Sequence, residues 1–183
     1  MIATVLCGCG RVAFQSRAED ANTTIDASAY EYVSFEAESG QVTPKFAVMP
    51  DPTASGGEYV IDTDNAGLTG PGSLINTFQL AVGPVPFYLW ARVIADDSAS
   101  DSFMLSVDGA AAIPFRTCVY GLSPSWQWVP VTADCPAGVD CCPTTNLGYS
   151  FTEGSHVLEL TSREGGSIID RIVVTNDPDY TGG

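Results

Sequence analysis

From Tyr30 onward, the sequence is divided into short apolar segments that recur roughly every ten residues and are separated by glycine, proline and polar turns. Several of them alternate in polarity: Phe78 and Leu80 fall on one face of a strand, while Thr77 and Gln79 fall on the other. No segment has a helical period of useful length. The pattern predicts an all-β fold, a jelly-roll or β-sandwich of two antiparallel sheets. The expected strands cover residues 32–38, 58–63, 73–82, 87–95, 102–108, 111–116, 127–132, 148–152, 156–161 and 167–175.

The first thirty residues differ from the rest. They begin with an apolar hexapeptide and pass into a polar run before the strand pattern starts. At 183 residues the chain is long enough for one domain with its own core. We therefore expect an extended N-terminal arm over residues 1–30 and a β-sandwich over residues 31–183. A cysteine-rich insertion is expected within the sandwich at about residues 117–145.

The charge balance excludes two classes of partner. Seven basic residues stand against 22 acidic ones, for a formal net charge of −15. Such a chain repels nucleic-acid phosphates and anionic membranes, so we expect neither as a partner. No stretch approaches the length of a transmembrane helix, so we expect no membrane span. Two interpretations of the acidic residues stay open: a solvated surface of the kind that extracellular proteins carry, or a few carboxylates that bind a hard cation such as calcium.

The cysteines indicate an oxidising compartment. Cys118, Cys135, Cys141 and Cys142 fall in one loop-rich stretch, without the paired spacing of a zinc site and far from His156, the only histidine. Disulfide bonds are therefore the better interpretation, although their connectivity stays open. Adjacent cysteines rarely bond to each other because that ring is strained, so Cys141 and Cys142 are expected to take different partners. Any cysteine left over is free to pair with one in the arm, at Cys7 or Cys9.

Disulfide bonds place the protein outside the cell or on the cell surface. Asn22 supports this expectation, because it opens an Asn-Thr-Thr sequon in the arm and is a candidate glycosylation site.

A series of short motifs gives the sequence a specific resemblance. In order, the motifs are YVSFEAE at residues 32–38, ASGGEYV at 54–60, FYLWARV at 87–93, DSFMLSVDG at 101–109, GSHVLEL at 154–160, REGG at 163–166 and IDRIVVTND at 169–177. Each motif is weak alone. In this order, over about residues 32–180, the chain resembles the calcium-binding β-sandwich carbohydrate-binding modules of families six and thirty-five, which have a galactose-binding-like fold. The first thirty residues and the insertion lie outside the resemblance.

A metal site is expected at the first of these motifs. On a strand, Glu36 and Glu38 project from the same face, and two adjacent carboxylates repel each other unless a cation lies between them. Calcium takes six to eight oxygen ligands, including carboxylates. The resemblance implies that Asp170, on the last strand, joins the two glutamates in a structural Ca²⁺ site, with a carbonyl from residues 53–55 as an addition. The alternative is that all three are solvated surface acids.

The tryptophans are candidates for sugar stacking. Trp126 and Trp128 share one face of an expected strand, and aromatic faces stack on sugar rings; packing of the sheet is the competing interpretation. Trp90 lies among apolar residues and is expected in the core. His156 lies in an alternating strand, where the resemblance implies a structural histidine. No nucleophile motif, phosphate loop or dinucleotide fingerprint occurs, so we expect no enzyme.

Two functions from different classes fit these features. The apolar residues 2–6 would be an aggregation hazard if exposed, and adding them to the sheet of a neighbouring copy, as a donor strand, would bury them. Such a head-to-tail contact does not close and generates a filament. The first hypothesis is therefore a non-enzymatic extracellular structural subunit that self-associates through its arm. The alternative is a carbohydrate-binding module, free-standing or part of a larger glycan-active protein, with a polysaccharide or other glycan as its partner.

Overall fold

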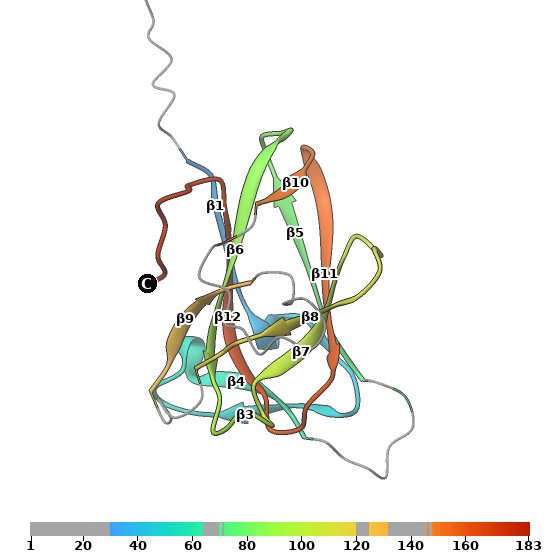
Figure 1. The fold of residues 1–183 in the computed structure, drawn as a ribbon, viewed down its shortest axis with the longest axis vertical. Helices are drawn as coiled ribbons and strands as arrows, with labels where there is room; N and C mark the ends of the chain where they lie inside the picture. The colour runs from blue at the N-terminus through green and yellow to red at the C-terminus, as the bar shows by residue number, and fades with distance from the viewer. Residues whose placement is uncertain (1–29, 64–69, 71, 120–124, 132–145, 147) are drawn as a thin grey trace, which may run out of the picture.

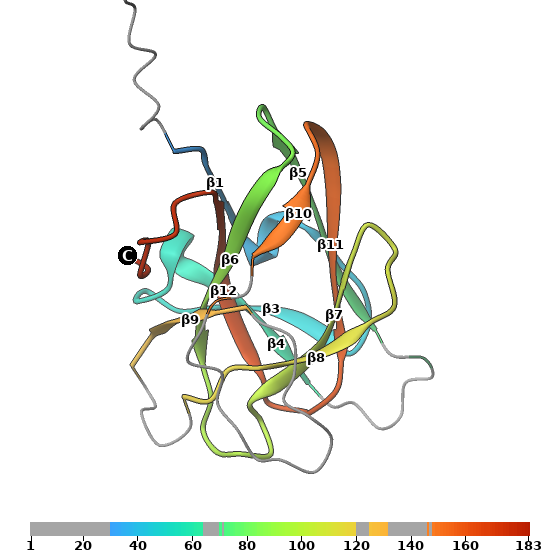
Figure 2. The ribbon, with the colours of Figure 1, turned by 45° about the horizontal axis from the view of Figure 1, so that its top comes forward.

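The computed structural model describes residues 30–63, 70, 72–119, 125–131, 146 and 148–183. Within these residues, twelve strands form two sheets of seven and five strands, and every pairing is antiparallel (Figures 1 and 2). The predicted all-β sandwich of two antiparallel sheets is confirmed. No helix in this part of the chain is long and apolar enough to cross a membrane.

The larger sheet has β12 near its centre. Strands β6 and β4 pair with β12 on its two sides, β1 pairs with the far half of β12, β10 and β9 pair with β6, and β3 pairs with β4. The bounds are β1 (Tyr32–Glu36), β3 (Phe46–Pro50), β4 (Glu58–Asp62), β6 (Val85–Ile94), β9 (Gln127–Pro130), β10 (Tyr149–Phe151) and β12 (Ile168–Thr175).

The smaller sheet has the order β2-β5-β11-β7-β8. Its strands are β2 (Gln41–Val42), β5 (Ser73–Leu80), β7 (Ser102–Val107), β8 (Ile113–Arg116) and β11 (Gly154–Ser162). Two 3₁₀ turns, η1 (Ala37–Ser39) and η2 (Ser55–Gly57), follow β1 and precede β4. Strand β9 falls within residues 117–145, so part of the expected insertion is an ordinary strand of the larger sheet.

The core lies between the sheets and is built by alternation. In β6, the side chains of Phe87, Leu89, Ala91 and Val93 are fully buried, and in β5 Phe78 and Leu80 are buried from the opposite sheet. Trp90 was expected in the core, and this expectation is wrong. It lies between Leu89 and Ala91 in β6, so its side chain falls on the outer face of the sheet.

Several expectations fall outside the described residues. These are the arm with its predicted donor strand and Asn22, and five of the six cysteines, among them Cys135, Cys141 and Cys142. Cys118 is described and is not a free thiol. Its bonding partner is not among the described residues, so the disulfide pairing stays a prediction.

Candidate metal centre and carbohydrate-binding face

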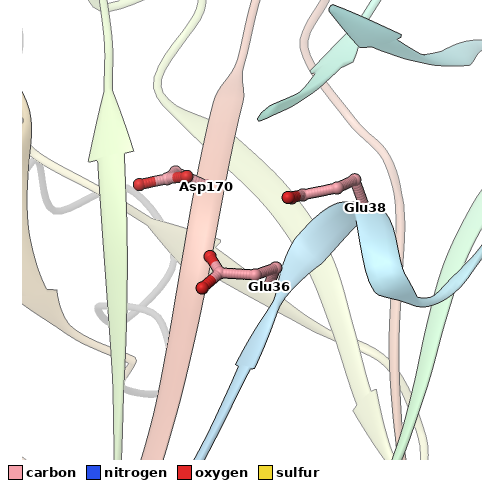
Figure 3. Close-up of side chains that lie close together, drawn as sticks. All are labelled: Glu36, Glu38 and Asp170. Atoms are coloured by element: carbon pink, nitrogen blue, oxygen red, sulfur yellow. The ribbon is translucent and has the colours of Figure 1, made fainter. Parts of the chain in front are cut away.

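Glu36, Glu38 and Asp170 come together, as the sequence predicted. Glu36 ends β1, Glu38 lies in η1 and Asp170 lies on β12, and their side chains converge on one point (Figure 3). One carboxylate oxygen from each residue lies within 4.8 Å of the others. The predicted reason for this convergence was wrong, however, because β1 ends at Glu36 and the two glutamates do not share a strand.

Local backbone geometry aims the three side chains. The chain turns after Glu36, where the Ser39 hydroxyl donates to the Glu36 carbonyl at 2.6 Å and the Gly40 N–H donates to the Ala37 carbonyl at 3.1 Å. This turn buries Ala37 and carries Glu38 back toward β12. The register of β12 against β6 shifts between Ile169 and Arg171, so the intervening residue, Asp170, lies at an irregularity of the kind that redirects a side chain.

Several carboxylate oxygens of the cluster are buried without hydrogen bonds from the described part of the chain. Asp170 is fully buried, and Glu36 and Glu38 are half-buried. Oε2 of Glu36, Oε2 of Glu38 and Oδ1 of Asp170 are buried without a hydrogen-bond partner among the described residues. Burial raises the pKa of the Glu38 carboxyl, and repulsion from Glu36 and Asp170 adds to it. Burial also raises the pKa of Asp170, although bonds from Ser55 and Arg92 offset part of this effect. Three converging carboxylates, each with a buried oxygen that lacks a hydrogen bond from this part of the chain, fit a hard cation.

The loop before β4 closes one side of the cluster. The Ser55 N–H donates to Oδ2 of Asp170 at 3.1 Å, and the Ser55 hydroxyl donates to Oε1 of Glu36 at 2.9 Å. Gly56 has φ +71°, and a Cβ atom there would lie 3.1 Å from Oε1 of Glu38. The position therefore favours glycine both for its left-handed backbone and for its closeness to the carboxylates.

Two arginines that sequence reasoning did not single out border the cluster. Arg92 on β6 donates to Asp170 and, at 3.2 Å, to the Thr53 carbonyl. Arg171 on β12 donates to the Ser34 hydroxyl at 2.8 Å and the Ser55 hydroxyl at 3.3 Å, and its Nε lies 3.7 Å from Oε1 of Glu36. The signal was present in the sequence, since both arginines belong to the quoted motifs and the chain has only seven basic residues.

Trp126 and Trp128 lie on the same side of the larger sheet but differ in surroundings. The Trp126 ring stacks under the Arg92 guanidinium at 5.0 Å, contacts Tyr59 edge-on, and its Nε1–H donates to the Thr53 hydroxyl at 3.1 Å. Trp128 lies opposite Arg92 in the β6–β9 register. Trp126 is thus held by these neighbours, whereas Trp128 contacts the ring of Tyr180 and also lines open space.

That open space is a cavity of about 300 Å³ beside the carboxylate cluster. Its lining combines an aromatic ring, two guanidinium groups and short polar side chains: Thr53, Ala54, Ser55, Arg92, Trp128, Arg171 and Gly183. The same arginines that contact Glu36 and Asp170 therefore also face the cavity. A largely preformed hollow with one ring and a few convergent donors is the usual composition of a small-ligand site.

Comparison with solved structures identifies the fold. The chain is similar to the GH26–CBM35 β-(1,4)-mannanase of Podospora anserina (17% identity, 81% of this chain and 28% of that one, TM-score 0.57). It is also similar to the exo-β-1,3-galactanase of Phanerochaete chrysosporium (17% identity, 79% of this chain and 29% of that one, TM-score 0.54). A third similar structure is the family 35 carbohydrate-binding module of Paenibacillus barcinonensis (15% identity, 79% of this chain and 99% of that one, TM-score 0.50).

The chain thus spans less than a third of the two enzymes but nearly the whole of the isolated module. No protein-family model matches the sequence, and no curated protein matches it. At these identities the likeness establishes the fold, and the fold is a carbohydrate-binding-module-like β-sandwich, as the ordered motifs implied.

Proposed function

We propose that the protein is a non-enzymatic, extracellular carbohydrate-binding domain that binds a polysaccharide on the outer face of its larger sheet. The observation that carries the proposal is the cavity between Trp128, Arg92 and Arg171. An aromatic ring offers a face for the C–H groups of a sugar, and the guanidinium groups offer donors fixed in direction to its hydroxyl or carboxylate oxygens. The fold, which is that of carbohydrate-binding modules, supports the same function.

The test is binding to a panel of soluble polysaccharides, measured by affinity electrophoresis. β-Mannan and β-1,3-galactan belong in the panel because similar structures are named for enzymes that act on them. Trp128→Ala is expected to weaken binding up to about tenfold, because loss of one stacking ring removes about 0.5–1.5 kcal/mol. Trp126→Ala is expected to weaken binding less, since its ring is already occupied by Arg92 and Tyr59.

Val157→Ala is the matched control, because Val157 is an exposed apolar side chain on the smaller sheet. The control should bind as the unchanged protein does. Equal binding by Trp128→Ala and the control would refute this site, and no binding to any polysaccharide by the unchanged protein would refute the function.

We further propose that Glu36, Glu38 and Asp170 hold a structural Ca²⁺ ion. The support is the convergence of three carboxylates, each with a buried oxygen that lacks a hydrogen-bond partner within the described part of the chain. Calcium accepts carboxylate ligands in irregular geometry, which suits residues from three separate elements. Because Ser55, Arg92 and Arg171 touch both the carboxylates and the cavity, the ion would fix the wall of the sugar site and take no chemical part in it.

The alternative hypothesis, assembly into a filament through the arm, concerns residues 1–29, which the structure does not describe. No contact between described residues favours it, and it stays a prediction. Its test is the mass in solution with and without residues 1–28: a mass equal to the monomer in both forms would refute it.

A further inference from the structure

The segment after β12 lies against the proposed sugar-binding face. In both Figures 1 and 2, the red C-terminal segment runs beside β1 and the larger sheet. The ring of Tyr180 contacts three aromatic side chains of that sheet edge-on. Ring centroids are 5.8 Å apart for Tyr32, 5.8 Å for Trp90 and 6.5 Å for Trp128. Tyr180 therefore fills a cradle of three rings contributed by β1, β6 and β9.

The hydrogen bonds that anchor the segment stop at Asp177. Asp177 accepts a bond from the Tyr32 hydroxyl, and its N–H donates to the Thr175 hydroxyl at 3.1 Å. Beyond this residue, the bonds join the segment to itself, as when the N–H of Gly183 donates to the Tyr180 hydroxyl at 3.3 Å. Between described residues, no hydrogen bond joins residues 178–183 to the sheet. Among the described residues, packing alone holds this part against the sheet, and a sugar that packs on the same rings competes with it.

The segment also separates three cavities on this face. The cavity of about 300 Å³ beside the carboxylates and a second of about 210 Å³ both border Trp128, Arg171 and Gly183. The second and a third of about 450 Å³ both border Tyr180. The cavities therefore adjoin in series across the sheet, and residues of the C-terminal segment stand at both junctions.

Gly182 shows how closely the segment fits. Its φ is +92°, and a Cβ atom at this position would overlap the Cβ and Cγ atoms of Trp128. Both the backbone conformation and the available space thus require glycine for the segment to lie on the face. Any larger residue at this position must move the segment away from Trp128.

We propose that residues 178–183 are an intramolecular cover for an extended glycan-binding groove. In the covered form, Tyr180 occupies the ring-binding cradle, and only a short stretch of sugar fits beside Arg92 and Arg171. Release of the segment joins the three cavities into one groove lined by Trp90, Trp128 and Tyr32. An open-ended groove of this kind takes an internal stretch of a polysaccharide chain. This inference rests on the proposed sugar-binding function. It adds that the ligand is a long stretch of glycan and that Tyr180 competes with this ligand for the same rings.

Two variants release the cover by different means. One ends the chain after Asp177, which keeps the anchoring bonds, and the other is Gly182→Val, which keeps every other residue. Gly109→Val is the matched control: Gly109 also has a positive φ, +71°, but nothing lies within 4 Å of its Cβ position, and it lies in the turn between β7 and β8 on the smaller sheet. It carries the same kind of backbone strain without the clash.

The first measurement is acrylamide quenching of tryptophan fluorescence, which needs no ligand. Both release variants are expected to raise the quenching constant at least about twofold, because Trp90 and Trp128 lose their cover; Gly109→Val should leave it unchanged. If neither release variant differs from the control, the segment does not cover the face in solution and the inference is overturned, whatever the sugar results are.

The second measurement is affinity for oligosaccharides of increasing length, cut from the polysaccharide that the unchanged protein binds. In the release variants, affinity for long oligosaccharides is expected to rise about tenfold while affinity for the shortest stays constant. Sugar binding that is unchanged at every length would overturn the groove while leaving the proposed function intact. Failure of all forms, released ones included, to bind any glycan would overturn the proposed function and this inference together, even with raised quenching.

Discussion

Nδ1 of His156 lies 2.7 Å from Oδ2 of Asp108, a pair that ties β11 to the turn after β7. Nε2 of the same ring lies 2.8 Å from the Thr152 carbonyl oxygen. A carbonyl only accepts hydrogen bonds and so does an ionised carboxylate, so both contacts are hydrogen bonds only when the imidazole is protonated and both ring nitrogens donate. Burial against Phe78 and Phe151 lowers the pKa of His156, but the bonds to Asp108 and Thr152 outweigh burial and raise it above 6.5.

This pair predicts a loss of stability as the pH rises above neutrality. The pKa of His156 is raised in the folded protein, so its contribution is fully present below the unfolded value of about 6.5 and disappears as the pH passes the folded pKa. His156→Gln removes the charge and is expected to flatten the melting temperature between about pH 6.5 and 8.5. Thermal melts across this range, with and without the substitution, measure the difference. Parallel curves would show that His156 does not titrate in this window.

A second titrating pair acts in the same direction at lower pH. Asp101 is 1% exposed, and burial together with the neighbouring Glu164 raises the pKa of Asp101 to about 6. A raised pKa in an acid means that the folded protein binds the proton more tightly than the unfolded chain. The neutral Asp101 carboxyl therefore makes its full contribution to the stability of the fold below about pH 4, and this contribution is lost as the pH rises through 6.

Asp101→Asn keeps the shape and stays neutral at every pH. Its amide is expected to donate permanently to Glu164 and to stabilise the protein by about 1–3 kcal/mol at pH 8, with little effect at pH 4. Urea unfolding at the two pH values measures this difference. A substitution that destabilises equally at both would mean that the proton on Asp101 is not what limits stability.

Removal of calcium is expected to lower the melting temperature. Ions that bind only the folded chain stabilise it by mass action, about 2.7 kcal/mol at a free concentration one hundred times the dissociation constant. Glu38→Gln removes one of the three carboxylates and should abolish the difference between Ca²⁺ and chelator. Glu153→Gln is the control with the same charge change at an exposed position away from the cluster, and it should keep the difference. The metal site would be refuted if the melting temperature of the unchanged protein were the same in chelator and in Ca²⁺.

Alternation predicted most of the fold but not its edges. The strands of the core were found from the sequence because one face of each is apolar, as with Phe78 and Leu80 in β5. Strand β3 was missed because it lies at the sheet edge and carries an exposed Met49 and a terminal Pro50, so its residues do not alternate. Trp90 was misplaced because bulk and apolar neighbours were given more weight than its position between Leu89 and Ala91.

The candidate site was predictable only where a motif carried it. Glu36, Glu38 and Asp170 were found through resemblance, although the 3₁₀ turn that orients Glu38 leaves no periodic signal. Arg92 stands in a quoted motif, but its contacts were not predictable, because they depend on the pairing between β6 and β9 and on a loop that brings Thr53 beside it. The contacts around Tyr180 join residues nearly 150 positions apart in the sequence, and these residues come together only when the sheet has formed.

Removal of the Arg92 guanidinium is expected to make the stability of the protein depend more strongly on calcium. Its guanidinium is the one basic group that donates to the fully buried Asp170 within the described residues, alongside the Ser55 N–H. Arg92→Met leaves a buried carboxylate without its counter-charge, which is expected to cost about 2 kcal/mol in chelator, less than a fully buried pair because Arg92 is partly exposed. Saturating Ca²⁺ supplies the missing positive charge and should recover most of this loss.

Arg163→Met is the comparison for that experiment, because Arg163 pairs with Glu164, which is not part of the carboxylate cluster. Its loss of stability should be the same in Ca²⁺ and in chelator. Urea unfolding of both variants in the two buffers gives four differences from the unchanged protein. If Arg92→Met loses equal stability in both buffers, then the cation does not neutralise Asp170, and Asp170 is not one of its ligands.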